Sequence, residues 1–141
     1  MTATWQFWAL LSAVFAALTA IFAKVGVSDI NSNFATFIRT LVVVAALAAL
    51  LAATGEYGSL RAISGKTWLF LGLSGLATGA SWLCYFRALQ IGKAAQVAPV
   101  DKLSVVFIAL IAAVFLGERL SLAGWAGAGL ITAGAVLLAA A

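Results

Sequence analysis

Histidine is absent from this chain of 141 residues, cysteine and proline occur once each, and Asp and Glu together number four. Without histidine, the sequence lacks imidazole metal ligands and the side chain that most often relays protons near neutral pH. The lone Cys84 cannot form an intramolecular disulfide. The sequence also contains no Gly-rich phosphate loop and no nucleophile with a suitable base. We therefore expect no catalytic residue, no metal site and no cofactor, and predict that the protein is not an enzyme.

Charged residues are also scarce, at 9% of the chain, whereas 65% of the residues are hydrophobic. In a soluble domain about a quarter of the residues are charged. The composition therefore predicts an integral membrane protein embedded in a lipid bilayer. The net charge of +4 does not indicate a nucleic-acid partner, because the Lys and Arg residues lie at the ends of apolar runs, where they set membrane topology. We expect a multi-pass protein of the cell membrane, of the prokaryotic inner-membrane type.

Five apolar runs are each long enough to cross a bilayer, which takes roughly 20 residues. The first run lacks the basic segment that opens a secretory signal, so we interpret it as a retained span. The polar stretch between the second and third runs is rich in Gly and typical of a surface loop. The sequence predicts one all-α integral membrane domain over residues 1–141, a bundle of five transmembrane helices near residues 5–23, 33–53, 67–90, 97–116 and 120–140.

Polar side chains recur along one face of two of these spans, at the spacing of a helix. Hydroxyls that face lipid would lack polar partners, so we predict that these faces line a cavity that binds a polar solute. For the third span, the alternative is that the hydroxyls only bond back to helix carbonyls. The residues are Thr36 and Thr40 in the second span and Ser74, Thr78, Ser81 and Tyr85 in the third, with Trp82 nearby either for packing or for stacking on a ligand.

The start of the fourth span combines a proline with two charged residues. Pro99 suits the first position of a helix, which would place Asp101 at the third, near free backbone N–H groups. One interpretation is that Asp101 and Lys102 form a substrate or proton site, since ionisable groups within a span usually serve a pathway. The second is that Asp101 only starts the helix while Lys102 extends to the surface. A third is an ion pair of Asp101 with Arg39 or Arg87.

Glycines recur in the third and last spans. Gly75 and Gly79 have the G-x-x-x-G spacing that lets helices approach closely, and the last span contains Gly124, Gly127, Gly129 and Gly134. We interpret both sets as packing surfaces.

The fourth span and the residues before it also carry motifs. Residues 88–99 fit the pattern A-L-x-x-G-x-A-x-x-V-A-P, residues 99–104 read PVDKLS and residues 115–119 read FLGER. With these motifs the chain resembles the EamA-type drug/metabolite transporter superfamily over nearly its whole length. The resemblance implies one five-helix repeat; members usually carry two repeats in opposite orientations, and many export amino acids or other small metabolites. The small multidrug resistance proteins are a more distant likeness, and their membrane-embedded Glu has no counterpart in the first span here.

These observations predict half of a transporter, completed by a second copy. The polar faces of single spans would form only part of a cavity wall, so we expect an antiparallel homodimer that exports a small polar metabolite by alternating access. The cationic side chains near the cavity favour a solute with a carboxylate over a cation. Two other hypotheses are a non-transporting accessory or assembly subunit, and half of a heteromeric transporter.

The basic residues do not command one orientation. With five crossings, Arg61, Lys66 and Arg119 share one membrane face, and Lys24 and Lys93 share the other. If only loop residues are counted, the first face has three basic residues and the second has two. If residues at the membrane edge are included, Arg39, Arg87 and Lys102 raise the count on the second face to five. Because the sign of the bias depends on how the edge is counted, the sequence predicts insertion in both orientations. The alternative is a modest bias toward one orientation and a parallel dimer.

Overall fold

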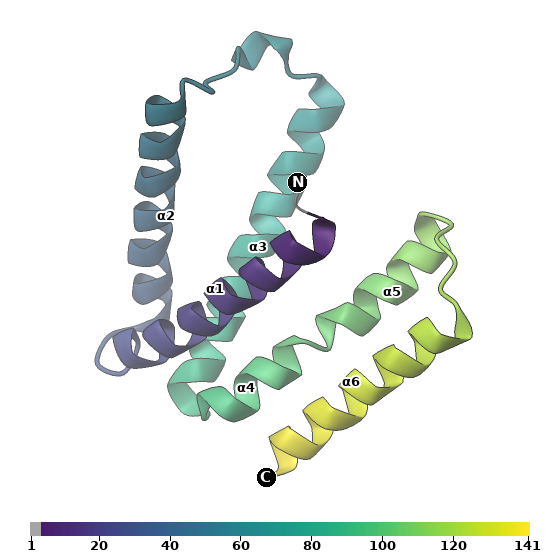
Figure 1. The fold of residues 1–141 in the computed structure, drawn as a ribbon. Coiled ribbons are helices and arrows are strands. Elements are labelled where there is room, and N and C mark those ends of the chain that lie inside the picture. The colour runs from purple at the N-terminus through teal and green to yellow at the C-terminus, as the bar shows by residue number, and fades with distance from the viewer. Residues whose placement is uncertain (1–3) are drawn as a thin grey trace. The chain divides into compact units, whose positions relative to one another are not determined.

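The computed structural model describes residues 4–141, apart from the side chain of Arg61. Its helices are α1 (Trp5–Gly26), α2 (Ser32–Thr54), the 3-10 turn η1 (Leu60–Ala62), α3 (Gly65–Ile91), α4 (Ala94–Asp101), α5 (Ser104–Phe115) and α6 (Leu122–Ala140) (Figure 1). No strand occurs among the described residues. The predicted all-α class is therefore confirmed.

Five segments of the described chain are long and apolar enough to cross a membrane, with α4 and α5 together forming one of them. Helices suit a bilayer because they satisfy their own backbone hydrogen bonds. Local signals fix their ends: Asn31 Oδ1 accepts the N–H groups of Asn33 (2.9 Å) and Phe34 (3.3 Å) at the start of α2. Gly55, at a φ of 70° that favours glycine, ends the same helix. Each predicted span thus corresponds to an observed helical segment.

The chain divides into two compact units, which we describe separately. The first, Ala23–Gln90, contains α2 and α3, which run in opposite directions and are joined by the segment around η1 (Figure 1). Its core lies where the turn between α1 and α2 meets the end of α3: Val27 and Leu89 have no exposed surface, and Phe86 is 3% exposed. This core fixes the two helices at that end.

The second unit comprises Met1–Phe22 and Ile91–Ala141. Within it α6 packs against α4 and α5. The buried residues of α5 and α6 are all alanines, namely Ala109, Ala112, Ala128 and Ala135. Small side chains let helix backbones approach closely, which is the main source of packing energy where lipid is as apolar as leucine.

The fourth span differs from the prediction in where its helix begins and in being interrupted. α4 already starts at Ala94, so Pro99 lies inside it, and Asp101 is its last residue. The predicted capping position of Asp101 is therefore wrong. The chain then tightens: the N–H groups of Lys102 and Leu103 bond three residues back, to Pro99 O (3.1 Å) and Val100 O (3.0 Å). Pro99 itself has no N–H to donate to Ala95 O, so the helical hydrogen bonds of α4 already lack one member just before this change.

The glycines of α3 also differ from expectation. A Cβ added at Gly72, Gly75 or Gly79 would meet no described atom within 4 Å. The close helix contact predicted from the G-x-x-x-G spacing is therefore not made within the first unit. Within the second unit the same is true of Gly127, Gly129 and Gly134 in α6, where the buried positions are alanines instead.

The packing of the first unit makes a testable prediction at Leu89. Leu89→Ala should lower the free energy of unfolding by about 2 kcal/mol, the lower end of the range for core Leu→Ala, because lipid or detergent rather than water surrounds the protein. Leu76, which is 74% exposed on the same helix, is the matched control. Leu76→Ala should change the free energy of unfolding by less than about 0.5 kcal/mol. Unfolding in detergent by heat or SDS measures both. Equal losses for the two variants would show that Leu89 is not a core residue.

Candidate functional site

The polar face of α2 is turned toward the protein. Thr36 is 5% exposed, and its hydroxyl donates to Ser32 O at 2.9 Å. Thr40 is half-buried and donates to Thr36 O at 2.8 Å. Both hydroxyl protons are thus bonded to backbone carbonyls of α2. The hydroxyl oxygens keep lone pairs that can still accept a hydrogen bond from a ligand.

Arg39, on the flank of this face, stacks on two aromatic rings of α3. Its Cζ lies 3.9 Å from the centroid of Trp82 and 5.6 Å from that of Phe86. Trp82 and Phe86 are four residues apart, so both rings stand on one side of α3. Attraction of a cation to a ring face is strongest for Trp and grows where water is excluded. These contacts join α2 to α3, and one face of Trp82 is occupied by the guanidinium.

The guanidinium of Arg39 has no other partner among the described residues. Its Nη1 is buried and forms no hydrogen bond. The side chain as a whole is only half-buried, so part of its donor edge stays open. From the sequence, Arg39 was expected at the edge of the membrane or in an ion pair with Asp101, and not among the lining residues. The available signal was the rarity of an ionisable group inside an apolar span.

The predicted stripe on α3 is exposed over most of its length. Ser74, Thr78 and Ser81 are exposed, and Tyr85 is half-buried. Thr78 donates to Ser74 O at 2.8 Å. No hydrogen bond joins the hydroxyl of Ser74 or Ser81 to a described residue. These two hydroxyls are therefore open to a partner outside the first unit.

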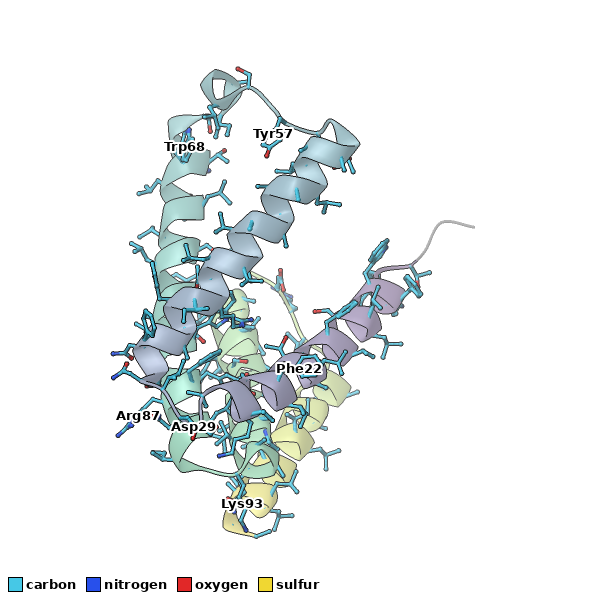
Figure 2. All side chains as sticks on the ribbon, turned by 90° about the vertical axis from the view of Figure 1, so that its left-hand side faces the viewer. Phe22, Asp29, Tyr57, Trp68, Arg87 and Lys93 are labelled. Atoms are coloured by element: carbon cyan, nitrogen blue, oxygen red, sulfur yellow. The ribbon has the colours of Figure 1, made fainter. Side chains whose placement is uncertain are left out.

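The end of α3 is tied to the turn between α1 and α2. Lys24 Nζ donates to Leu89 O at 2.6 Å, and Gln90 Nε2 donates to Ile30 O at 3.0 Å. Arg87 Nη1 donates to Gln90 Oε1 at 2.8 Å. Figure 2 shows Arg87 at this end of the unit, and Tyr57 and Trp68 at the opposite end. The role of Gln90 could not be predicted from the sequence, since helix periodicity does not indicate which carbonyls of a distant turn lie within its reach.

Asp101 and Lys102 belong to the second unit, at the interruption of the fourth span. Lys102 Nζ lies 3.3 Å from Asp101 Oδ2, with both side chains more than a third exposed. An exposed pair of this kind contributes little stability. The carboxylate caps no backbone N–H group of α5, which has no side-chain cap. Within the second unit the acid is thus paired with its neighbour, and within the first unit Arg87 is bonded to Gln90.

The chemistry of these side chains is that of binding. Residues 4–141 contain no group of three or more His, Cys, Asp or Glu side chains placed to hold a metal ion. The first unit brings together one guanidinium, two aromatic rings and two threonine oxygens, and α3 adds a row of open hydroxyls. Such groups can hold a polar solute by charge and hydrogen bonds.

Comparison with known proteins gives relatives over the whole length. The sequence matches the EamA-like transporter family over residues 3–140. An "Uncharacterized transporter in cobO 3'region" from Sinorhizobium sp. is 63% identical over 139 residues, which cover 99% of this chain and 99% of the relative. No solved structure gives a significant match. The resemblance predicted from the motifs is confirmed.

The open hydroxyls of α3 make the second testable prediction. If the stripe faces water in the membrane, cysteine placed at Ser74 or Ser81 should react with a water-soluble maleimide several-fold faster than cysteine at Leu73 or Leu76. Thiolates form and react in water and not in lipid. Labelling rates in intact membranes measure the difference.

The native Cys84 is exposed and must first be replaced by alanine. Cysteine placed at Thr78 or Tyr85 should also react faster than cysteine at the leucine positions. Equal rates along all faces of α3, or faster reaction at the leucine positions, would show that the stripe faces lipid.

Proposed function

The chain belongs to the EamA-like transporter family, and we propose that it acts as an antiparallel homodimer that exports a small polar metabolite by alternating access. It is a multi-pass membrane protein with five segments able to span the bilayer in its described part. Its relative comes from a bacterium, which supports placing it in the bacterial cell membrane. The cavity lies between the two copies and is lined by the polar faces of α2 and α3.

The observation that carries this proposal is the pair of open hydroxyls on α3. Ser74 and Ser81 lie inside a candidate span, are exposed, and have no hydrogen-bond partner among the described residues. A hydroxyl held in hydrocarbon without a partner is unfavourable. A second copy that packs over this face and leaves a hydrated space beside it would supply the missing partners. The glycines of α3, which leave room for a close neighbour, support the same arrangement.

The interrupted fourth span supplies an element that can move. Between α4 and α5, around Lys102, the backbone hydrogen bonds join residues that are three apart instead of four. Transporters often use discontinuous helices near their sites, and irregular backbone in a membrane is tolerated where it faces protein or water. In this proposal the segment from Pro99 to Leu103 bends as the cavity opens to either side, and Asp101 and Lys102 are electrostatic elements at its edge.

The antiparallel arrangement rests on charge and on the family. The counts of basic residues on the two faces are nearly balanced, so neither orientation is imposed. Lys24 and Gln90 form hydrogen bonds between the turn that joins α1 to α2 and the end of α3. These bonds support the assignment of the end of α1, the start of α2 and the end of α3 to one membrane face. Two copies in opposite orientations would rebuild the inverted repeats typical of larger relatives, about a two-fold axis in the membrane plane.

The third prediction tests this orientation. A cytoplasmic and a periplasmic reporter, each fused to the C-terminus, should both be active, because copies insert both ways. Adding two lysines beside Lys66 should favour one orientation and silence one reporter, and adding two beside Lys93 should silence the other.

The two lysine-shifted variants should complement each other's transport when expressed together and fail when expressed alone. Activity from a single reporter in the native chain would refute dual insertion and leave either a parallel dimer or a partner encoded separately. If the native chain inserts in both orientations but shows no transport, either alone or together with one of the variants, the accessory-subunit hypothesis would be supported.

The fourth prediction concerns Pro99. Pro99→Ala restores a backbone donor inside α4 and should raise the free energy of unfolding by about 1–3 kcal/mol, since proline is unfavourable in a helix interior. If bending of this segment is part of transport, the same change should slow transport several-fold. Val97→Ala, which keeps every backbone donor, is the control and should leave the transport rate unchanged. A more stable Pro99→Ala variant with a native rate would show that the interruption takes no part in transport.

A further inference from the structure

Arg39 is a charged residue inside a candidate membrane span, within α2. Charges within spans are costly and generally mark a ligand or ion pathway. In a purely structural role the guanidinium would be expected to have an acidic or carbonyl partner that satisfies its N–H groups. The question is therefore which partner Arg39 has.

No carboxylate of the first unit is bonded to it. Asp29 Oδ2 accepts from Ser28 Oγ at 3.1 Å, and Glu56 Oε2 accepts from Thr54 Oγ1 at 3.1 Å. Neither acid forms an ion pair with Arg39, and the ion pair found among the described residues is that of Asp101 with Lys102. The charge of Arg39 is thus uncompensated within its own unit.

Stacking on Trp82 and Phe86 does not use the hydrogen-bonding capacity of the guanidinium. A ring face attracts the flat face of the cation, whereas the N–H groups point outward in the plane of the guanidinium. The two contacts therefore hold the plane in position and leave its edge available. Nη1 is buried without a partner, which is costly unless a ligand or a movement satisfies it.

We propose that Arg39 is an anion site that binds the carboxylate of a small monocarboxylate substrate, an inference that rests on the transport function proposed above. The planar edge of a guanidinium matches the two oxygens of a carboxylate. One unpaired cation balances one negative charge, whereas a dianion such as hydrogen phosphate would keep one charge that no group of the first unit compensates.

The neighbouring groups define the rest of the substrate class. Thr36 and Thr40 have committed their hydroxyl protons to the backbone, so their oxygens can accept a hydrogen bond but not donate one. A hydroxyl or amino group on the substrate would match these acceptors. Trp82 and Phe86 restrict the guanidinium from one side, which lowers the entropy lost on binding.

The test uses the wild-type protein with arginine labelled by ¹³C and ¹⁵N in its guanidinium group, in a neutral detergent without anionic lipid. The sequence contains four arginines, Arg39, Arg61, Arg87 and Arg119, so at most four guanidinium signals need assignment. The guanidinium signal that disappears in Arg39→Lys is assigned to Arg39. If that variant fails to fold, Trp82→Leu assigns it instead, through the lost ring-current shift.

Acetate, lactate and benzoate are titrated against acetamide, lactamide and benzamide, with inorganic phosphate as a separate arm. At least one carboxylate should shift the Arg39 signal in a saturable way while its amide does not. The signal of Arg87, which already bonds to Gln90, is the internal control and should stay in place. In Arg39→Gln the affinity for that carboxylate should fall at least about 30-fold, the loss expected when one partner of a close charge pair is removed.

Three results would overturn the assignment. The first is an Arg39 signal that moves with no carboxylate up to its solubility limit, or moves equally with the amide. The second is a response only to phosphate or to added phosphatidylserine, which would indicate a different anion or a lipid headgroup. The third is a large shift of the Arg39 signal in Asp101→Asn without ligand, which would show that Asp101 is its partner.

A flux assay separates this inference from the proposed function. Proteoliposomes that move a neutral or cationic solute while Arg39 ignores carboxylates would leave the transporter intact and remove the anion site. Saturable carboxylate binding at Arg39 with no flux in proteoliposomes would retain the site and count against transport by this chain alone.

Discussion

A bilayer interior offers peptide groups nothing to hydrogen-bond, and the structure follows from that constraint. It explains why five apolar runs become helices and why Thr36, Thr40 and Thr78 donate to carbonyls of their own helices. It also makes each exception informative. A proline inside α4 removes one backbone donor, and in the first unit two seryl hydroxyls of α3 and Nη1 of Arg39 have no hydrogen-bond partner.

Those exceptions fall on the spans that were expected to form the cavity. α2 contributes Arg39, α3 contributes the aromatic rings and the open hydroxyls, and the fourth span contributes the irregular backbone. Transport requires groups that bind a solute and then release it, and groups fully satisfied by the protein could not do so. The unsatisfied groups are therefore where a family of transporters would be expected to keep its function.

Sequence patterns predicted the helices well and the contacts between them poorly. The five spans followed from length and hydropathy, and the family followed from motifs near Pro99 and Glu118. Asp101 was misplaced because proline suits a first helical turn better than an interior, and only the structure shows that α4 starts earlier, at Ala94. The stacking of Arg39 on Trp82 joins two helices, and periodicity within one helix cannot predict such a contact.

The central claim is that one copy supplies only part of the path and that two copies together transport. It can be tested most directly by reconstituting the purified, fluorescently labelled chain into single liposomes, counting copies by photobleaching, and following uptake of a labelled carboxylate in each liposome. Liposomes with one copy should show no uptake, and about half of those with two randomly oriented copies should be active, as expected for an antiparallel pair. Uptake in single-copy liposomes, or none at any copy number, would contradict the account.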